Sequence, residues 1–120
     1  MIQHNGQTLA YIGDAVYELF IRETLITKGY VKPDDLHKAA IQYTGAEGQK
    51  NALETIEPML EESERAVVRR GRNASTARRA KNAPLSTYRL ATGFEALIGY
   101  LYLSEKTERM RELLETLRVE

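Results

Sequence analysis

The chain has 120 residues, enough for the core of one domain, and it contains no cysteine, which excludes disulfide bonds and thiolate metal sites. Its 17 basic residues balance 17 acidic ones, and the longest apolar run, residues 96–103, is too short to span a bilayer. The start of the chain has no basic region followed by an apolar stretch, so no signal peptide is visible. We therefore expect one soluble, cytoplasmic domain covering residues 1–120.

The first predicted element is an amphipathic helix over about residues 8–28. Asn5 or Thr8 is suited to cap its start, and Gly29 stands where helices commonly end. Its apolar residues recur at helical spacing and form one broad face: Leu9, Ile12, Val16, Leu19 and Phe20.

Two residues in this helix run against the pattern. Gly13 costs about 1 kcal/mol relative to alanine in a helix interior, and the carboxylate of Asp14, if buried and unpaired, costs several kcal/mol. We infer that Gly13 lets another backbone approach and that Asp14 holds a metal ion.

Three shorter helices are predicted next, over residues 33–43, 46–56 and 59–70. Pro33 suits the first turn of the second helix, and Thr44 and Gly45 mark the break that follows it. The third helix ends before Pro58. The fourth has its acids first and its arginines last, which complements the helix dipole.

A basic segment follows, and residues 71–86 within it are predicted to form a loop closed by Pro84. Between positions 65 and 94 there are eight basic residues and no acidic one, which indicates a polyanion partner; the alternative is a solvated charged loop. The basic residues are Arg65, Arg69, Arg70, Arg72, Arg78, Arg79, Lys81 and Arg89.

The last two predicted helices are a long apolar one, capped by Ser86 or Thr87 and reaching about residue 103, and a short one from Thr107. Like the first helix, the long helix contains residues that are unfavourable inside an apolar helix, namely glycines and one acid, Glu95. No strand-like alternation is present. The predicted class is all-α.

Asp14 and Glu95 are therefore candidates for one metal site shared between two packed helices. The alternative is that each carboxylate bonds or caps a neighbouring helix inside the core. Glu18 lies one turn beyond Asp14 and either orients a ligand of the metal or is a structural residue.

These motifs resemble a known family. Residues 11–19, Tyr-Ile-Gly-Asp-Ala-Val-Tyr-Glu-Leu, resemble the signature helix of the ribonuclease III catalytic domain, and residues 94–103 resemble its second acidic motif in the same order. A chain of this length leaves no room for the double-stranded-RNA-binding domain that usually follows. A bare catalytic domain that carries Arg-Arg-Gly-Arg-Asn-Ala at residues 69–74 is similar to the Mini-ribonuclease III branch of that family.

The resemblance implies the all-α helical bundle of a ribonuclease III catalytic domain. It implies a homodimeric, Mg²⁺-dependent endonuclease (with Mn²⁺ as a substitute) that cleaves double-stranded RNA and matures the 23S ribosomal RNA precursor. Asp14 and Glu95 would be the catalytic, metal-binding acids. Where larger members have two further acids, this chain has Ala10 and Thr92.

The basic segment would hold the RNA backbone, because A-form RNA is recognised mainly through its phosphates and 2′-hydroxyls. One rival interpretation is a non-catalytic RNA-binding module of the same fold, favoured by Ala10 and Thr92. Another is a helical scaffold that binds only protein. The predicted RNA-binding residues are Arg69, Arg70, Arg72, Asn73, Arg78, Arg79 and Lys81.

Overall fold

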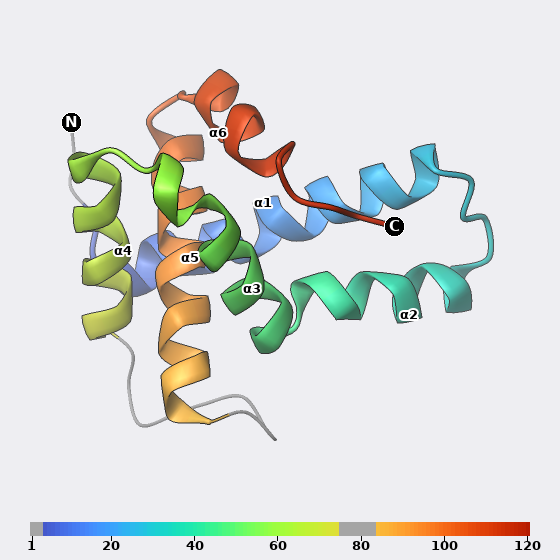
Figure 1. Cartoon of the computed structure of the whole chain (residues 1–120), viewed down its shortest axis with the longest axis horizontal. Coiled ribbons are helices and arrows are strands. Elements are labelled where there is room, and N and C mark those ends of the chain that lie inside the picture. The colour runs from blue at the N-terminus through green and yellow to red at the C-terminus, as the bar shows by residue number, and fades with distance from the viewer. Residues whose placement is uncertain (1–3, 75–83) are drawn as a thin grey trace.

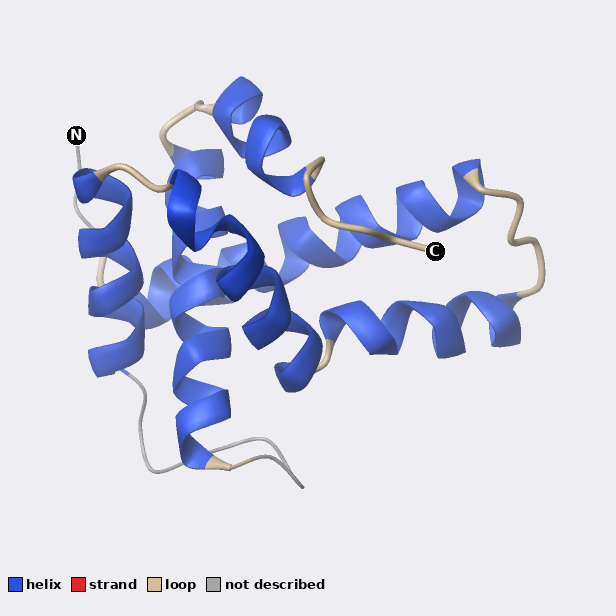
Figure 2. Cartoon of the chain, in the orientation of Figure 1, coloured by secondary structure: helices blue, strands red, loops and turns tan. Residues whose placement is uncertain are grey.

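The computed structural model describes residues 4–74 and 84–120, and every regular element within them is helical (Figures 1 and 2). The predicted all-α class is therefore confirmed. The elements are α1 (Gly6–Thr27), α2 (Pro33–Thr44), α3 (Ala46–Ile56), the 3₁₀ turn η1 (Glu57–Met59), α4 (Glu62–Ala74), α5 (Leu85–Leu103) and α6 (Thr107–Leu114).

Helix α5 is the centre of the fold, and α1, α3 and α4 pack around it (Figure 1). Its apolar residues point in several directions, as expected of a helix that is covered on most sides. Phe94 and Leu97 are fully buried, and the Phe94 ring meets the ring of Tyr17 edge to face, with centroids 4.8 Å apart. Helices α1 and α2 extend away from this centre as a hairpin.

The ends of α1 follow the predicted chemistry. The side chain of Asn5 accepts a hydrogen bond from the Thr8 amide at 2.8 Å, so the helix begins at Gly6. Gly29 follows its end with a φ of 104°, a conformation that glycine adopts without the strain that a side chain would bring. Pro33 occupies the first turn of α2, and α3 has its predicted bounds.

The prediction for α4 was wrong at both ends. The helix begins at Glu62 rather than residue 59 because the Glu64 carboxylate accepts the Glu61 amide at 2.8 Å and so fixes the first turn there. It continues through Gly71 to Ala74, which the sequence assigned to a loop. Gly71 packs against the backbone of α5 at Thr92, so its small size serves helix packing rather than helix termination.

The remaining part of the predicted loop, residues 75–83, lies outside the described residues. The predicted caps of α5 were also wrong, because that helix begins at Leu85 and Ser86 and Thr87 lie inside its first turn. Pro84 precedes it with a φ of −60°, the value fixed by its ring. Helix α6 begins at Thr107 as predicted.

Helix α6 is tied to α4 by Arg109. Its guanidinium meets both carboxylate oxygens of Glu64, with each N···O distance 2.8 Å, and donates to the Met59 carbonyl at 2.7 Å. Among residues 4–74 and 84–120, no helix is both long enough and apolar enough to cross a membrane.

Candidate active site

The site is built where α1 crosses α5 with glycines on both sides of the contact. A Cβ added to Gly13 would lie 1.7 Å from the Glu95 carbonyl oxygen, and one added to Gly99 would lie 1.9 Å from the Leu9 carbonyl oxygen. The backbones of the two helices therefore approach each other closely at these two glycines, which confirms the predicted role of Gly13. This close crossing brings Asp14, the next residue of α1, beside Glu95.

We expect Gly13→Ala to destabilise the protein by about 3 kcal/mol, the upper part of the range for overpacking, because a backbone atom occupies the space of the new methyl group. Chemical denaturation measures the change. Gly45→Ala is the matched control, since the nearest atom to its added Cβ is 3.1 Å away. An equal effect of the two substitutions would contradict the close-crossing argument.

The two acids predicted from the sequence are hydrogen-bonding neighbours. Burial of the half-buried Glu95 carboxyl raises its pKa, and the hydrogen bond and negative charge of Asp14 raise it further, to about 8. The amide of Gln49 opposes this shift by favouring the charged form. Two carboxyl groups held this close, one of them poorly solvated, form a site of negative potential that favours a cation.

Gln49 is the site residue that sequence reasoning missed. Its side chain is only 2% exposed, and its Nε2 donates to Oε2 of Glu95 at 3.1 Å and to the Thr44 carbonyl at 3.1 Å. The signal was weak because Gln49 stands in a polar stretch of α3 with no motif around it. Only the packing of α3 against α5 shows where this side chain points.

The positions of the two missing family acids are occupied by packing residues. Ala10 is buried in a small apolar cluster with Leu9, Val67 and Ala96. The hydroxyl of Thr92 donates to the Tyr88 carbonyl of its own helix at 3.0 Å. Neither side chain brings a further negative charge to the pair of acids.

Glu18, the candidate for orienting a metal ligand, pairs with Arg22 on the same helix at 3.2 Å. The pair stands at the edge of a hollow between α1 and α2 that His37 also lines. Arg22 therefore supplies a structural partner for Glu18, one turn beyond the acids.

The acids present fit a hard divalent cation with few protein ligands. Within residues 4–74 and 84–120, no group of three histidine, cysteine or acidic side chains is placed to hold a metal. Mg²⁺ commonly takes one or two carboxylates and completes its octahedron with water and substrate phosphate oxygens. The pair Asp14 and Glu95 meets this requirement.

Four of the predicted RNA-binding residues, Arg69, Arg70, Arg72 and Asn73, lie on α4. Arg69 pairs with Glu62 at 2.9 Å, and Arg70 donates to the His4 carbonyl, which ties α4 to the start of the chain. Arg72 and Asn73 are exposed at the end of α4. Arg78, Arg79 and Lys81 lie outside the described residues.

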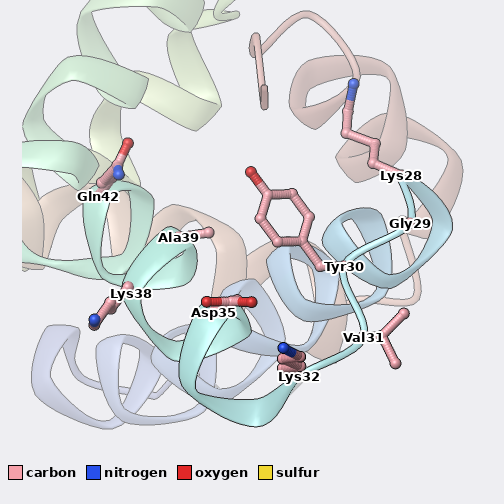
Figure 3. Close-up of a pocket in the computed structure, with 9 residues that line it drawn as sticks. All are labelled: Lys28, Gly29, Tyr30, Val31, Lys32, Asp35, Lys38, Ala39 and Gln42. Atoms are coloured by element: carbon pink, nitrogen blue, oxygen red, sulfur yellow. The ribbon is translucent and has the colours of Figure 1, made fainter.

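A surface hollow at the far end of the α1–α2 hairpin is separate from the acids. Figure 3 shows Tyr30 pointing into it, with Lys28, Lys32 and Lys38 around its rim. The Tyr30 hydroxyl donates to the Glu120 carbonyl at 3.3 Å. Neither the acid pair nor the predicted RNA-binding residues line this hollow.

Comparisons with known proteins agree with these features. The model of the Ribonuclease III domain family matches residues 7–106. A relative named Mini-ribonuclease 3 from Brevibacillus brevis is 54% identical over 111 residues, covering 92% of this chain and 83% of the relative. Another of that name from Enterococcus faecalis is 46% identical over 114 residues, covering 93% and 86%. A crystal structure of a protein from Fusobacterium nucleatum superposes with a TM-score of 0.84 at 29% identity, covering 94% of this chain and 90% of that one.

Proposed function

Because the chain belongs to the ribonuclease III family and is an endoribonuclease acting on RNA, we propose that it cleaves double-stranded RNA with Mg²⁺ held by Asp14 and Glu95. The observation that carries this proposal is the glycine crossing of α1 and α5, which brings two acids from distant parts of the chain side by side. Mn²⁺ is the expected substitute for Mg²⁺, since it also prefers oxygen ligands.

The ion would polarise the scissile phosphate and lower the pKa of the attacking water. The chain's own contribution is to bind and orient. Asp14 and Glu95 supply the negative charge, and the close crossing at Gly13 and Gly99 keeps the two carboxyl groups within hydrogen-bonding reach of each other. No amino-acid nucleophile is required in this scheme.

A test of the proposal is incubation of the purified protein with duplex RNA and Mg²⁺, with and without a chelator. We expect fragments only when the metal is available. The rival function, an RNA-binding module without activity, is favoured by the apolar packing of Ala10 and by the bonded hydroxyl of Thr92. Retention of RNA without any fragment would support that rival and contradict the nuclease proposal.

We further propose that the basic segment holds the phosphate backbone, with Arg72 and Asn73 among its exposed residues. Replacing Arg78, Arg79 and Lys81 by alanine should make the plot of log affinity against log salt shallower, by about one unit for each phosphate that the protein no longer neutralises. Duplex binding measured by fluorescence anisotropy in chelator provides the slope.

Arg111→Ala, in an exposed arginine of α6 outside the basic segment, is the control for the salt slope. It should leave the slope unchanged. An unchanged slope for the triple variant as well would contradict binding of the RNA backbone by this segment.

A homodimer is proposed from the exposed apolar side chains of the hairpin. Tyr11 is 83% exposed on α1, and Leu19 and Ile26 of the same helix are 58% and 59% exposed. Together with exposed Ile41 on α2, they offer a surface of the kind that mediates association. Two copies joined through α1 would bring two pairs of acids to one duplex.

Leu19→Lys should convert this dimer to a monomer, because it places a charge within the apolar contact. Sedimentation velocity measures the change in mass. Leu103→Lys, on an exposed leucine at the end of α5, is the matched control and should keep the dimer. A wild-type protein that sediments as a monomer at high concentration would contradict the proposal.

The 23S ribosomal RNA precursor is the proposed cellular substrate, with the cytoplasm as the proposed location. This proposal rests on the similarity to relatives named Mini-ribonuclease 3. Defined fragments from a transcript carrying the paired ends of the precursor would support it. Equal cutting of unrelated duplexes of the same length would count against it.

A further inference from the structure

We propose that Gln49 is a positioning residue that holds the Glu95 carboxylate in the orientation required to bind the divalent cation. This inference rests on the proposed metal-dependent function and adds to it a residue from α3, outside both acidic motifs. It is carried by the geometry of one buried amide.

The hydrogen bonds of Gln49 fix the orientation of its amide. A carboxamide nitrogen has two hydrogens, and Nε2 uses them on the Thr44 carbonyl and on Oε2 of Glu95, both at 3.1 Å. The carbonyl of Thr44 can only accept, so the nitrogen rather than the oxygen of the amide must face it. The side chain is 2% exposed, which leaves it little freedom to move away from Glu95.

The backbone around Gln49 is equally constrained. Gly48 stands in the first turn of α3, where the corner between α2 and α3 brings it against the end of α2: an added Cβ would be 2.2 Å from the Gln42 carbonyl oxygen and 2.7 Å from that of Tyr43. The corner thus brings Thr44 and Gln49 together and directs the amide toward α5. The Gln49 amide is therefore held by the main chain at Thr44, and it restrains the side chain of Glu95 in the site.

A neutral donor suits this task better than a cation. A lysine or arginine at this position would restrain the carboxylate but would also neutralise charge that the metal ion needs. An amide orients the carboxylate and favours its charged form, as the opposing effect of Gln49 on the pKa of Glu95 indicates, without adding positive charge. Mutation of a residue that hydrogen-bonds a metal ligand commonly lowers metal affinity or activity by about 10- to 100-fold.

The test compares Gln49→Met, which keeps the length of the side chain and removes the donor, with Gln42→Met on an exposed glutamine of α2. Mn²⁺ binding to the RNA-free protein is measured by electron paramagnetic resonance. We expect about 10- to 100-fold weaker Mn²⁺ binding for Gln49→Met, with Gln42→Met like the wild type. Duplex binding in chelator should be unchanged in both.

A purely structural role gives a different result. Gln49→Met would then melt at a lower temperature but bind Mn²⁺ with wild-type affinity while folded, and this outcome overturns the inference. Gln49→Asn keeps the amide but is shorter by one methylene, so it cannot span both acceptors; we expect a loss of Mn²⁺ affinity here too. Wild-type affinity in this variant would also overturn the inference.

If neither variant folds, the wild-type protein provides the measurement. The side-chain amide protons of Gln49 should be broadened by substoichiometric Mn²⁺ in an NMR titration, and sharp signals would overturn the inference. Failure of the proposed function is distinguishable, because wild-type protein would then neither bind Mn²⁺ nor cleave duplex RNA.

Discussion

Asp14→Asn and Glu95→Gln should each abolish cleavage of duplex RNA while leaving the metal-free protein folded and at least as stable as the wild type. Each substitution removes one of the two carboxylates proposed to hold Mg²⁺. Loss of several kcal/mol of transition-state stabilisation lowers the rate by about 1000-fold or more. Single-turnover cleavage measures the rate, and full activity of either variant would contradict the proposed site.

The stability gain follows from the raised pKa of Glu95. The folded protein holds the Glu95 proton up to a pH of about 8, whereas the unfolded chain releases it near the ordinary value of 4.5. The unfolded state is therefore favoured progressively as pH rises from about 4.5 to about 8. Glu95→Gln has no such proton to release, so we expect it to be more stable than the metal-free wild type at pH 8, by about 1–3 kcal/mol.

Urea denaturation in chelator at pH 5 and pH 8 tests this expectation. The difference between variant and wild type should be small at pH 5 and larger at pH 8. Adding Mg²⁺ at pH 8 should stabilise the wild type and leave Glu95→Gln little changed, because a ligand stabilises only the folded state that binds it. Equal pH dependence of the two proteins would contradict the burial of a shared proton in this pair.

The acid pair could be predicted because both helices break their own pattern. Gly13 with Asp14, and Glu95 among the glycines of α5, are costly in an apolar helix unless they serve a contact or a site. The structure places the backbone contact and the acids at one crossing. Residues that interrupt an apolar helical pattern can thus be recognised from the sequence without knowing which helix packs against them.

The role of Gln49 and the ends of α4 could not be predicted, because no break in the local sequence pattern marks them. A glutamine in a polar helical stretch is ordinary, and its burial depends on how α3 packs against α5. The sequence places Gly71 in a loop, but in the structure it lies inside α4, where its small size allows the close approach of α5. Helix termini depend on such tertiary contacts as well as on local propensity, so boundaries are read less securely than helix type.

Arg109→Met should produce the other large effect, a loss of about 3 kcal/mol or more of folding stability with the active site intact. Glu64 is 4% exposed, and the guanidinium of Arg109 contacts both of its carboxylate oxygens. Removing one partner of a buried pair leaves an uncompensated charge, which commonly costs about 3–5 kcal/mol. Arg111→Met, on an exposed arginine of the same helix, is the control and should cost far less.

The pH dependence of stability distinguishes loss of this ion pair from loss of packing as the cause of the destabilisation in Arg109→Met. The hydrogen bond from Arg109 holds the pKa of Glu64 below its ordinary value. The pair therefore contributes its stability above the ordinary pKa of a glutamate, and this contribution is lost as pH falls through the lower folded value. The gap between wild type and Arg109→Met in urea denaturation should thus narrow on acidification from pH 7 toward pH 3. A gap of constant size would contradict the ion pair and show that Arg109 stabilises α4 and α6 by packing alone, since a packing contribution does not depend on pH.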